Sequence, residues 1–456
     1  MESAITNFLS TVVDYAWGMP LVVLLVGGGL FLSIYSGFQP ILGIKHAIQL
    51  VCGKHAEEEK LADGQISHFQ ALSNALAATI GLGNIGGVAV AIHQGGPGAI
   101  FWMWVAAFIG MNTKFFECAL AVMYRGRDCY NEVQGGPMYV IDKALGPKWK
   151  PMAIFFAVCG LVGTMALFQS NQLAAYSSDN YGISAALVGV FCAVFVGIVL
   201  RGGLKSIARA TSSLVPTMCV FYVICAIIIL ILNFEKVPGV FLLIFTEAFN
   251  GSALVGGAEG MAVIAILKIG VKRAAFSNEA GIGTAPMAHG NAKTNEPISE
   301  GYVAMLGPFL DTILVCTLTA LVILTSVDFT AVDADTEGVL LTALAFETSF
   351  GAFGKHFLGL AILLFSTTTM IGMANYNNKC WHYLFKGKKG FGEKTFIAVF
   401  CLCLFLGAIA EMGNVVNVLD IGFAFMAIPN MIATLILAPR VMQAFRKYKA
   451  KYMDEL

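Results

Sequence analysis

The chain has 456 residues, of which 57% are hydrophobic and 12% are charged, and its formal net charge is zero. A soluble globular protein carries about 25% charged residues, so this chain has too few polar side chains to cover a surface that faces water. The composition indicates a membrane protein that crosses the bilayer many times. The zero net charge argues against nucleic acid as a partner.

Apolar stretches long enough to cross a bilayer as helices, about 20 residues each, predict eleven transmembrane helices in an all-α membrane protein. In chain order they cover residues 15–36, 66–94, 97–124, 151–178, 183–200, 212–233, 255–291, 300–325, 355–383, 395–410 and 415–438. The second, seventh and ninth are too long or too rich in glycine to be simple rods.

Lysine and arginine concentrate in the loops 125–150, 201–210 and 386–394 and in the C-terminal tail, whereas the loop 326–354 is acidic. Basic loops stay on the cytoplasmic side of a membrane. With eleven spans, all the basic segments fall on one side. This distribution predicts a multi-pass protein of the cell (inner) membrane, with its N-terminus outside and its C-terminus in the cytoplasm.

The predicted spans divide into one helix plus ten. Residues 1–65 form the extra N-terminal helix and its connector, residues 66–233 a first set of five spans, and residues 234–456 a second set of five with the tail. Each set begins with a glycine-interrupted helix, and five spans per set give the two sets opposite topology. A 5+5 inverted-repeat core with two discontinuous helices is typical of secondary transporters, which bind substrate at the broken helices.

The first interruption is the segment Gly81–Gly87, which holds four glycines in seven residues. Each glycine disfavours a continuous helix by about 1 kcal/mol relative to alanine. Backbone groups freed inside a membrane need partners. A cation satisfies freed carbonyls, and a substrate carboxylate satisfies freed N–H groups at a helix N-terminus. Close helix packing through small residues is the alternative.

Two segments resemble the signatures of a known family. They are Gly95-Gly-Pro-Gly-Ala-Ile-Phe-Trp-Met-Trp-Val-Ala-Ala-Phe-Ile-Gly110 and Phe276-Ser-Asn-Glu-Ala-Gly-Ile-Gly-Thr-Ala-Pro286. Both resemble the hallmarks of the sodium:alanine symporter family, and the hydropathy agrees from end to end. The resemblance implies a symporter that takes up alanine and glycine with Na⁺ as the co-transported ion and with no cofactor. The sequence holds no hydrolase, metalloenzyme or ATPase motif, so no enzyme is expected.

The stretch Ala78-Thr-Ile-Gly-Leu-Gly-Asn84 is similar to the unwound first core helix of the bacterial leucine transporter. This resemblance implies that the N–H groups of Leu82 and Gly83 bind the substrate carboxylate. It also implies that the carbonyls of Ala78 and Thr79 bind the substrate amine. The sodium ligands that it implies are Ala77, Thr79, Ile80 and the side chain of Asn84.

The second interruption is predicted at residues 271–284, because Gly281-Ile-Gly283 echoes Gly81-Leu-Gly83. There Ser277 and Asn278 offer oxygens to substrate, and Phe276 offers a wall. Residues 250–257 are the rival position. The charges of Lys272, Arg273 and Glu279 are the difficulty with the first choice, because charges at membrane depth need partners or water.

The remaining candidates are polar residues within other spans. One hydroxyl in a membrane helix usually bonds to its own helix, but four in a row cover every face. In the leucine-transporter fold the eighth core helix supplies sodium ligands, which makes Ser366, Thr367, Thr368 and Thr369 candidates. The third core helix flanks substrate there, which points to Phe168, Gln169 and Asn171; amides that only join helices are the alternative.

Asp311 lies near the centre of the predicted span 300–325. A carboxylate inside the membrane is a functional candidate by default. We therefore interpret Asp311 as a coupling residue. The alternative to sodium coupling is proton coupling through Asp311. The alternative to any coupling role is a structural one, in which a protonated Asp311 bonds to a neighbouring helix. A channel is the less favoured functional class.

Overall fold

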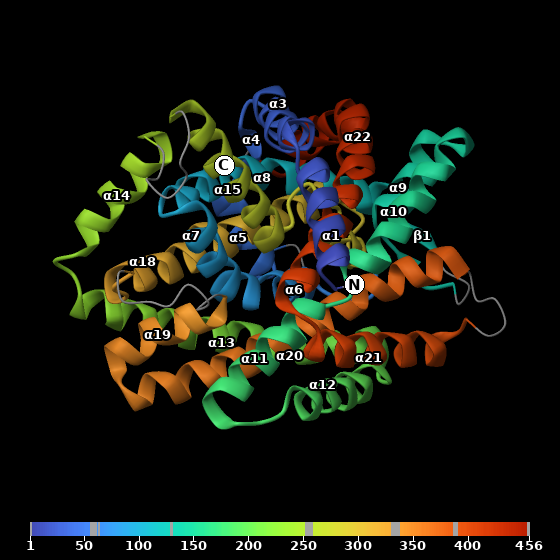
Figure 1. Cartoon of the computed structure of the whole chain (residues 1–456). Coiled ribbons are helices and arrows are strands. Elements are labelled where there is room, and N and C mark those ends of the chain that lie inside the picture. Colours follow the sequence, from blue (N-terminus) through green and yellow to red (C-terminus); the bar gives the residue numbers. More distant parts are fainter. Residues whose placement is uncertain are drawn as a thin grey trace.

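Helices make up nearly all of the structure, as the apolar runs of the sequence predict (Figure 1). The computed structural model describes residues 2–54, 62, 64–127, 131–250, 259–329, 338–385 and 391–453. Two short strands, β1 (Gly126–Arg127) and β2 (Val133–Gln134), pair antiparallel. The predicted helical class is thus correct.

Six helices of the described residues are long and apolar enough to cross a membrane: Gly98–Met123, Pro147–Tyr181, Ser206–Leu232, Pro297–Ser326, Ala352–Phe385 and Met412–Tyr452. Two bent helix pairs, Thr6–Ala16 with Met19–Tyr35 and His68–Thr79 with Gly83–Gly95, raise the number to eight. Three further apolar helices are shorter than the bilayer requires: Ala185–Leu200, Val237–Asn250 and Val339–Phe350. The prediction of many spans is correct at this level of detail.

The N-terminal segment bends where the sequence predicts one helix over 15–36. α1 (Glu2–Ala16) is followed by α2 (Met19–Val22), the π-helical turn η1 (Val23–Gly27) and α3 (Gly28–Tyr35), and the two parts meet at 45°. Pro20 lies in the first turn of α2, where a missing N–H is tolerated. The predicted start was therefore too late, and the bend was missed. The short helices α4 (Gln39–Leu42) and α5 (Ile44–Val51) follow.

The interruption predicted in the helix over 66–94 is present. α6 (His68–Thr79) begins at Ser67, whose side chain accepts from Gln70 while the Gln70 side chain bonds back. The π-helical turn η2 (Gly83–Gly87) and α7 (Val88–Gly95) continue at 51° to α6, and α8 (Gly98–Met123) follows. Every residue from 71 to 92 is buried, so this bent helix lies inside the protein.

A second, unpredicted interruption lies in the span over 151–178. α10 (Lys150–Gly163) and α11 (Leu167–Tyr181) are separated by three residues, among which Ala166 has a φ of 56°. A left-handed conformation is unusual for a residue with a Cβ, so an alanine at this position does not predict the interruption. The elements that precede and follow this pair in the chain are α9 (Pro137–Val140), η3 (Ile141–Leu145), η4 (Pro147–Trp149), α12 (Ala185–Leu200), α13 (Gly203–Leu232) and α14 (Val237–Asn250).

The helix is also interrupted at the favoured second position, but only at the end of the predicted segment, residues 271–284. α15 (Glu259–Asn278) runs unbroken to Asn278, and residues 279–284 then turn into α16 (Ala285–His289). Glu279, Gly281 and Gly283 have φ values of 57°, 82° and 94°. Residues 251–258, nearly all of the rival break, lie outside the described residues.

The last elements complete the helical bundle. They are α17 (Pro297–Pro308), η5 (Phe309–Cys316), α18 (Thr317–Ser326), α19 (Val339–Phe350), α20 (Ala352–Phe385), α21 (Glu393–Ile409) and α22 (Met412–Tyr452). α12 and α21 lie side by side at one edge (Figure 1). The interior helix α6 packs against α13 and α20, and η2 packs against α15 and η5.

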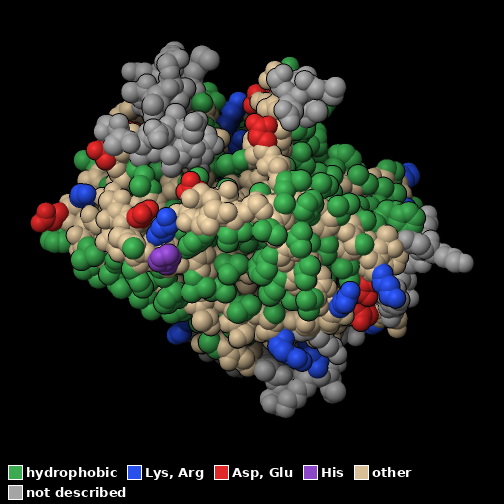
Figure 2. Space-filling model, turned by 60° about the horizontal axis from the view of Figure 1, so that its bottom comes forward, with side chains coloured by type: hydrophobic (Ala, Val, Ile, Leu, Met, Phe, Trp, Pro, Cys, Tyr) green, Lys and Arg blue, Asp and Glu red, His purple; other side chains and the backbone are tan. Residues whose placement is uncertain are grey.

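The surface that these helices present is largely apolar. Leu187, Ile198, Val220, Ile231 and Leu242, from α12, α13 and α14, are all more than half exposed. Figure 2 shows hydrophobic side chains over most of one face, with only scattered charges. Apolar side chains on the exterior are what a protein surrounded by lipid requires, because lipid cannot hydrogen-bond to polar groups.

Candidate functional site

The first interruption is stabilised by a side chain that takes the place of a backbone partner. In a continuous helix the Gly81 N–H would bond to the Ala77 carbonyl. Here it donates to Asn84 Oδ1 at 2.9 Å, and the Asn84 N–H donates to the Gly81 carbonyl at 3.1 Å. Gly81 also lies against α20: a Cβ at this position would be 2.0 Å from Thr369 Oγ1. The helix therefore unwinds where another helix approaches its backbone.

The Asn84 side chain connects this break to a buried carboxylate. Asn84 Nδ2 donates to Asp311 Oδ1 at 2.7 Å and to the Asp311 carbonyl at 3.1 Å. Ser277 and Thr312 hydroxyls donate to Asp311 Oδ2 at 2.5 and 2.7 Å, and Asn278 Nδ2 donates to Thr312 Oγ1 at 3.0 Å. All five side chains are at least 98% buried. This group, Asn84, Ser277, Asn278, Asp311 and Thr312, is called the Asp311 cluster below.

Four of the five residues of the Asp311 cluster were sequence candidates from three separate segments. The structure places the Asn84 amide nitrogen and the hydroxyls of Ser277 and Thr312 around the Asp311 carboxylate, and carboxylate and hydroxyl oxygens are ligands that hard cations prefer. Sequence reasoning missed Thr312. It sits next to Asp311, but one hydroxyl in a membrane helix carries no signal of its own.

The four consecutive hydroxyl residues on α20, 366–369, are called the hydroxyl run below, and their hydrogen bonding divides them into two groups. Ser366, Thr367 and Thr368 each donate to a carbonyl of their own helix, at Leu363 or Leu364. Thr369 Oγ1 is buried, has no hydrogen-bond partner among the described residues, and faces Gly81. Thr369 is thus the member of the run that faces the break.

A small pocket lies beside the break. Of the predicted substrate residues, Ala78, Thr79, Gly83, Gln169 and Phe276 line it. Sequence reasoning missed the other lining residues, which are Gly163, Ala166, Met373, Leu419 and Phe423. The free volume is about 10 Å³, room for about one water molecule. The pocket is therefore closed around its centre.

Aromatic rings form one wall of this pocket. The Phe276 ring meets Phe168 edge-on at 5.3 Å between centroids and lies 5.7 Å from Phe423. Phe168 thus stands behind Phe276 and does not line the pocket. Leu82 is buried away from it, and Asn171 donates to carbonyls at Gly407 and Ala410 at 3.1 and 2.7 Å. Asn171 joins two helices, the alternative considered for it.

The charged residues of the predicted second interruption (271–284) all have partners. Arg273 Nη2 lies 2.6 Å and Lys272 Nζ 3.3 Å from Asp420 Oδ2 on α22. The Arg273 guanidinium also lies 5.3 Å from the centre of the Phe276 ring. The Thr284 hydroxyl donates to Glu279 Oε2 at 2.6 Å. Asp420 lies about 150 residues from its partners, so the sequence did not reveal this pairing.

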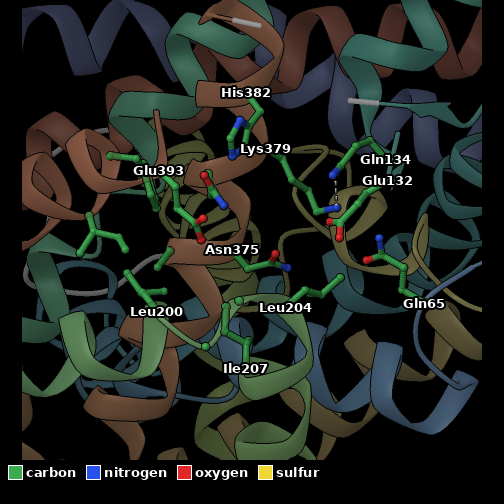
Figure 3. A pocket seen from close by; sticks show the side chains of 16 residues that line it. Gln65, Glu132, Gln134, Leu200, Leu204, Ile207, Asn375, Lys379, His382 and Glu393 are labelled. Carbon is green, nitrogen blue, oxygen red and sulfur yellow. Dashed lines mark hydrogen bonds between the residues drawn. The ribbon is translucent and has the colours of Figure 1, made fainter. Parts of the chain in front are cut away.

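Two larger cavities flank the closed pocket. A cavity of about 580 Å³ is lined by α13, α20 and α21 residues (Figure 3), and one of about 270 Å³ by Asn171 and Gln172 of α11 with residues of α19 and α22. On α20, Met373 lines the pocket and the next residue, Ala374, lines the larger cavity. On α11, Gln169 lines the pocket and Asn171 the smaller cavity. The pocket therefore adjoins the larger cavity along α20 and the smaller cavity along α11.

Comparison with known proteins agrees with the signature segments. The model of the sodium:alanine symporter family matches residues 1–455. The sodium/alanine symporter AgcS of Methanococcus maripaludis is 41% identical over 439 residues, which are 95% of this chain and 94% of that protein. An uncharacterized transporter of Haemophilus influenzae is 38% identical over 99% of this chain and 98% of its own. The amino-acid carrier protein AlsT of Bacillus subtilis is 32% identical over 98% of this chain and 93% of its own.

Proposed function

Because the chain belongs to the sodium:alanine symporter family, a family of multi-pass membrane transporters and not of enzymes, we propose that it couples inward transport of alanine and glycine to a Na⁺ gradient. The observation that carries this proposal is the closed pocket at a broken helix, with a larger cavity next to it along α20 and another along α11. A site that opens to one side at a time is what alternating access requires.

Substrate binding is assigned to the pocket. The carbonyls at the end of α6, at Ala78 and Thr79, receive the amine, and the N–H groups at the start of η2, at Leu82 and Gly83, receive the carboxylate. Gln169 and Phe276 complete the enclosure, since both line the pocket. A volume near one water molecule means that the pocket must widen to admit even alanine, and the methyl group then lies among glycine and phenylalanine.

Cation binding is assigned to two places beside the pocket. The first is the Asp311 cluster, in which Asn84 connects the carboxylate to the break. The second lies between the break and α20, where Thr369 offers a hydroxyl oxygen beside Gly81, and the carbonyls of Ala77 and Ile80 are the further ligands assigned to it. Thr369 is preferred because it is the hydroxyl found beside Gly81. The hydroxyls of Thr79, Ser366, Thr367 and Thr368 are directed at carbonyls of their own helices.

The proposed architecture keeps eleven spans, an extra N-terminal helix (1–65) and two five-span repeats (66–233 and 234–456). The bent pairs and the short apolar helix α12, which coincides with the predicted span 183–200, support a count above six. The proposed orientation has the N-terminus outside and the C-terminus in the cytoplasm of a cell (inner) membrane, because Arg125, Arg201, Lys394 and the basic tail after residue 440 then face the cytoplasm.

Radiolabelled alanine uptake into proteoliposomes tests the proposal. An inward Na⁺ gradient without a pH gradient should drive accumulation, and a pH gradient without Na⁺ should not. Glycine should compete with alanine. Asp311→Asn keeps the shape of the side chain but removes its charge, and it should abolish the Na⁺-driven accumulation. Uptake driven by the pH gradient alone would instead support proton coupling through Asp311, and uptake that never saturates would indicate a channel.

A further inference from the structure

The larger cavity beside α20 has the size of a ligand site. Its volume of about 580 Å³ falls within the range of about 300–1,000 Å³ that small-molecule pockets occupy. Its wall includes β2 and the residues before it, the start of α13, the inner part of α20 and the start of α21. The basic residues Arg125, Arg201 and Lys394 border the same segments, so in the proposed orientation this cavity faces the cytoplasm.

One face of α20 supplies polar groups to the cavity. Asn375, Asn378, Lys379 and His382 follow each other at the three- and four-residue spacing of a single helix face, and all four line it. Asn375 is 5% exposed. Its Nδ2, like Asn378 Oδ1, is a buried atom without a hydrogen-bond partner among the described residues. These two amides are therefore able to bind a polar ligand.

The cavity carries charges of both signs. Lys379 is 4% exposed, and its Nζ donates to Gln134 Oε1 at 2.9 Å, the dashed contact in Figure 3. Gln134 holds the ammonium at the wall of the cavity. Two exposed carboxylates, Glu132 before β2 and Glu393 at the start of α21, line the same space. A cation set among amides, with carboxylates nearby, complements a small zwitterion.

A close contact between α20 and α6 lies next to both this cavity and the closed pocket. Gly372 of α20 lies against α6, where a Cβ would be 2.8 Å from the Ala78 nitrogen and 3.0 Å from its Cα. Ala78 and Met373 line the pocket, and Ala374 and Asn375 line the cavity. A substrate that leaves the pocket on this side of the Gly372–Ala78 contact reaches Asn375 first and Lys379 one turn later.

We propose that this cavity is a second binding site for an α-amino acid, with Lys379 binding the carboxylate and Glu132 and Glu393 attracting the ammonium group. The site receives the amino acid between the closed pocket and the cytoplasm. This inference rests on the proposed transport function. It adds a substrate contact on the cytoplasmic side that is separate from the broken helices.

Transport measured from each side of the membrane tests the second site. Inside-out and right-side-out vesicles give the alanine concentration for half-maximal transport at the cavity side and at the opposite side, with Na⁺ saturating. Lys379→Gln keeps a hydrogen-bonding side chain but removes the charge. Loss of a charge-assisted hydrogen bond should raise the half-saturating concentration about tenfold at the cavity side, and much less at the opposite side. Lys379→Arg should restore most of the lost affinity.

Lys394→Gln is the matched control, because Lys394 is an exposed neighbour of Glu393 that does not line the cavity. It should behave like the parent on both sides. Glu393→Gln, at an exposed position, keeps the test valid if Lys379→Gln does not fold, and it should give a smaller rise on the cavity side alone. Equal shifts on both sides, or no shift in the folded variants, would overturn the second site. A parent protein without Na⁺-driven alanine transport would overturn the proposed function itself, together with the second site.

Discussion

The two Gly-x-Gly segments of this chain look alike in sequence and differ in structure. Gly81 and Gly83 keep negative φ values in a helix that unwinds for three residues and resumes at 51°. Gly281 and Gly283 have φ values of 82° and 94°, in a turn between α15 and α16. The first pair gives space to a neighbouring helix and to the pocket, and the second pair gives the backbone a left-handed path. One motif thus satisfies two different physical requirements.

From this difference we infer that the first interruption is the one that binds the transported solutes, as proposed above, and that the second meets a requirement of folding. At the first, Asn84 and Thr369 place polar groups at the unwound backbone, one bonded to Asp311 and one without a partner. At the second, the Asn430 amide donates to the Gly281 carbonyl at 2.9 Å, and Pro137 and Phe156 pack against Gly283. Substitutions at the first should therefore change transport, and substitutions at the second should change stability.

Gly283→Ala should have the largest effect, and on stability. A left-handed alanine costs about 1–2 kcal/mol, and its Cβ would approach Pro137 Cγ at 2.7 Å and Phe156 Cε2 at 2.8 Å, which adds about 1–3 kcal/mol of overpacking. Thermal unfolding of the purified protein measures the loss. Gly146→Ala is the control, because Gly146 has a φ of 88° and nothing within 4 Å of its Cβ position. Equal losses of stability in the two variants would rule out a contribution from overpacking against Pro137 and Phe156.

Gly81→Ala should destabilise the protein by about 1–3 kcal/mol, because its Cβ would be 2.0 Å from Thr369 Oγ1. The double variant Gly81→Ala with Thr369→Ala removes the obstructing hydroxyl, so it should recover stability. The double variant should not recover Na⁺ affinity, because it lacks the Thr369 hydroxyl oxygen that is proposed to bind the cation. A single variant as stable as the parent would contradict the close approach of the two helices.

Thr369→Ala should raise the Na⁺ concentration for half-maximal alanine uptake about tenfold, with alanine affinity largely restored at saturating Na⁺. The reason is that binding of the two solutes is coupled and the coupling is reciprocal. Thr367→Ala is the control: it removes a hydroxyl that bonds to its own helix at Leu363, and it should titrate like the parent. If the two variants behave alike, the hydroxyl run takes no part in cation binding.

Gly83→Ala should have the smallest and most selective effect. The added methyl group would lie 3.5 Å from Phe276 Cδ1, an ordinary contact, so the protein should stay folded. The added methyl group takes up space in the pocket. A pocket that no longer accommodates one methyl group of a substrate loses affinity for that substrate about tenfold or more. Alanine should lose affinity relative to glycine, measured by competition. Gly87→Ala is the control, since its Cβ would also approach Phe276, at 3.7 Å, but Gly87 does not line the pocket.

Part of the site could be predicted from the sequence because its cause is local. Glycines at 81, 83, 86 and 87 weaken one helix wherever it is placed, and the structure breaks that helix at residues 80–82. The signature around Phe276 and Ser277 placed both near the break. The kink at Ala166 could not be predicted, because alanine favours a helix and only packing holds it at a φ of 56°.

The choice among similar side chains depended on the tertiary structure. Neighbouring residues on a helix point about 100° apart, so the sequence could not tell which of four hydroxyls faces the break, and packing of α20 against Gly81 selects Thr369. Asp311, a candidate on its own, becomes a partner of Asn84 and Ser277 only because η5 packs against η2 and α15.

The sequence by itself determined the class of protein, its family and the position of the first interruption. Apolar length, charge placement and glycine content act locally or through the solvent, so they need no knowledge of neighbours. Only the tertiary structure decided which distant residues meet: Asp420 with Arg273, Thr369 with Gly81, and Phe423 with Phe276. These contacts join helices far apart in the chain, and close packing of those helices fixes them within a few ångströms.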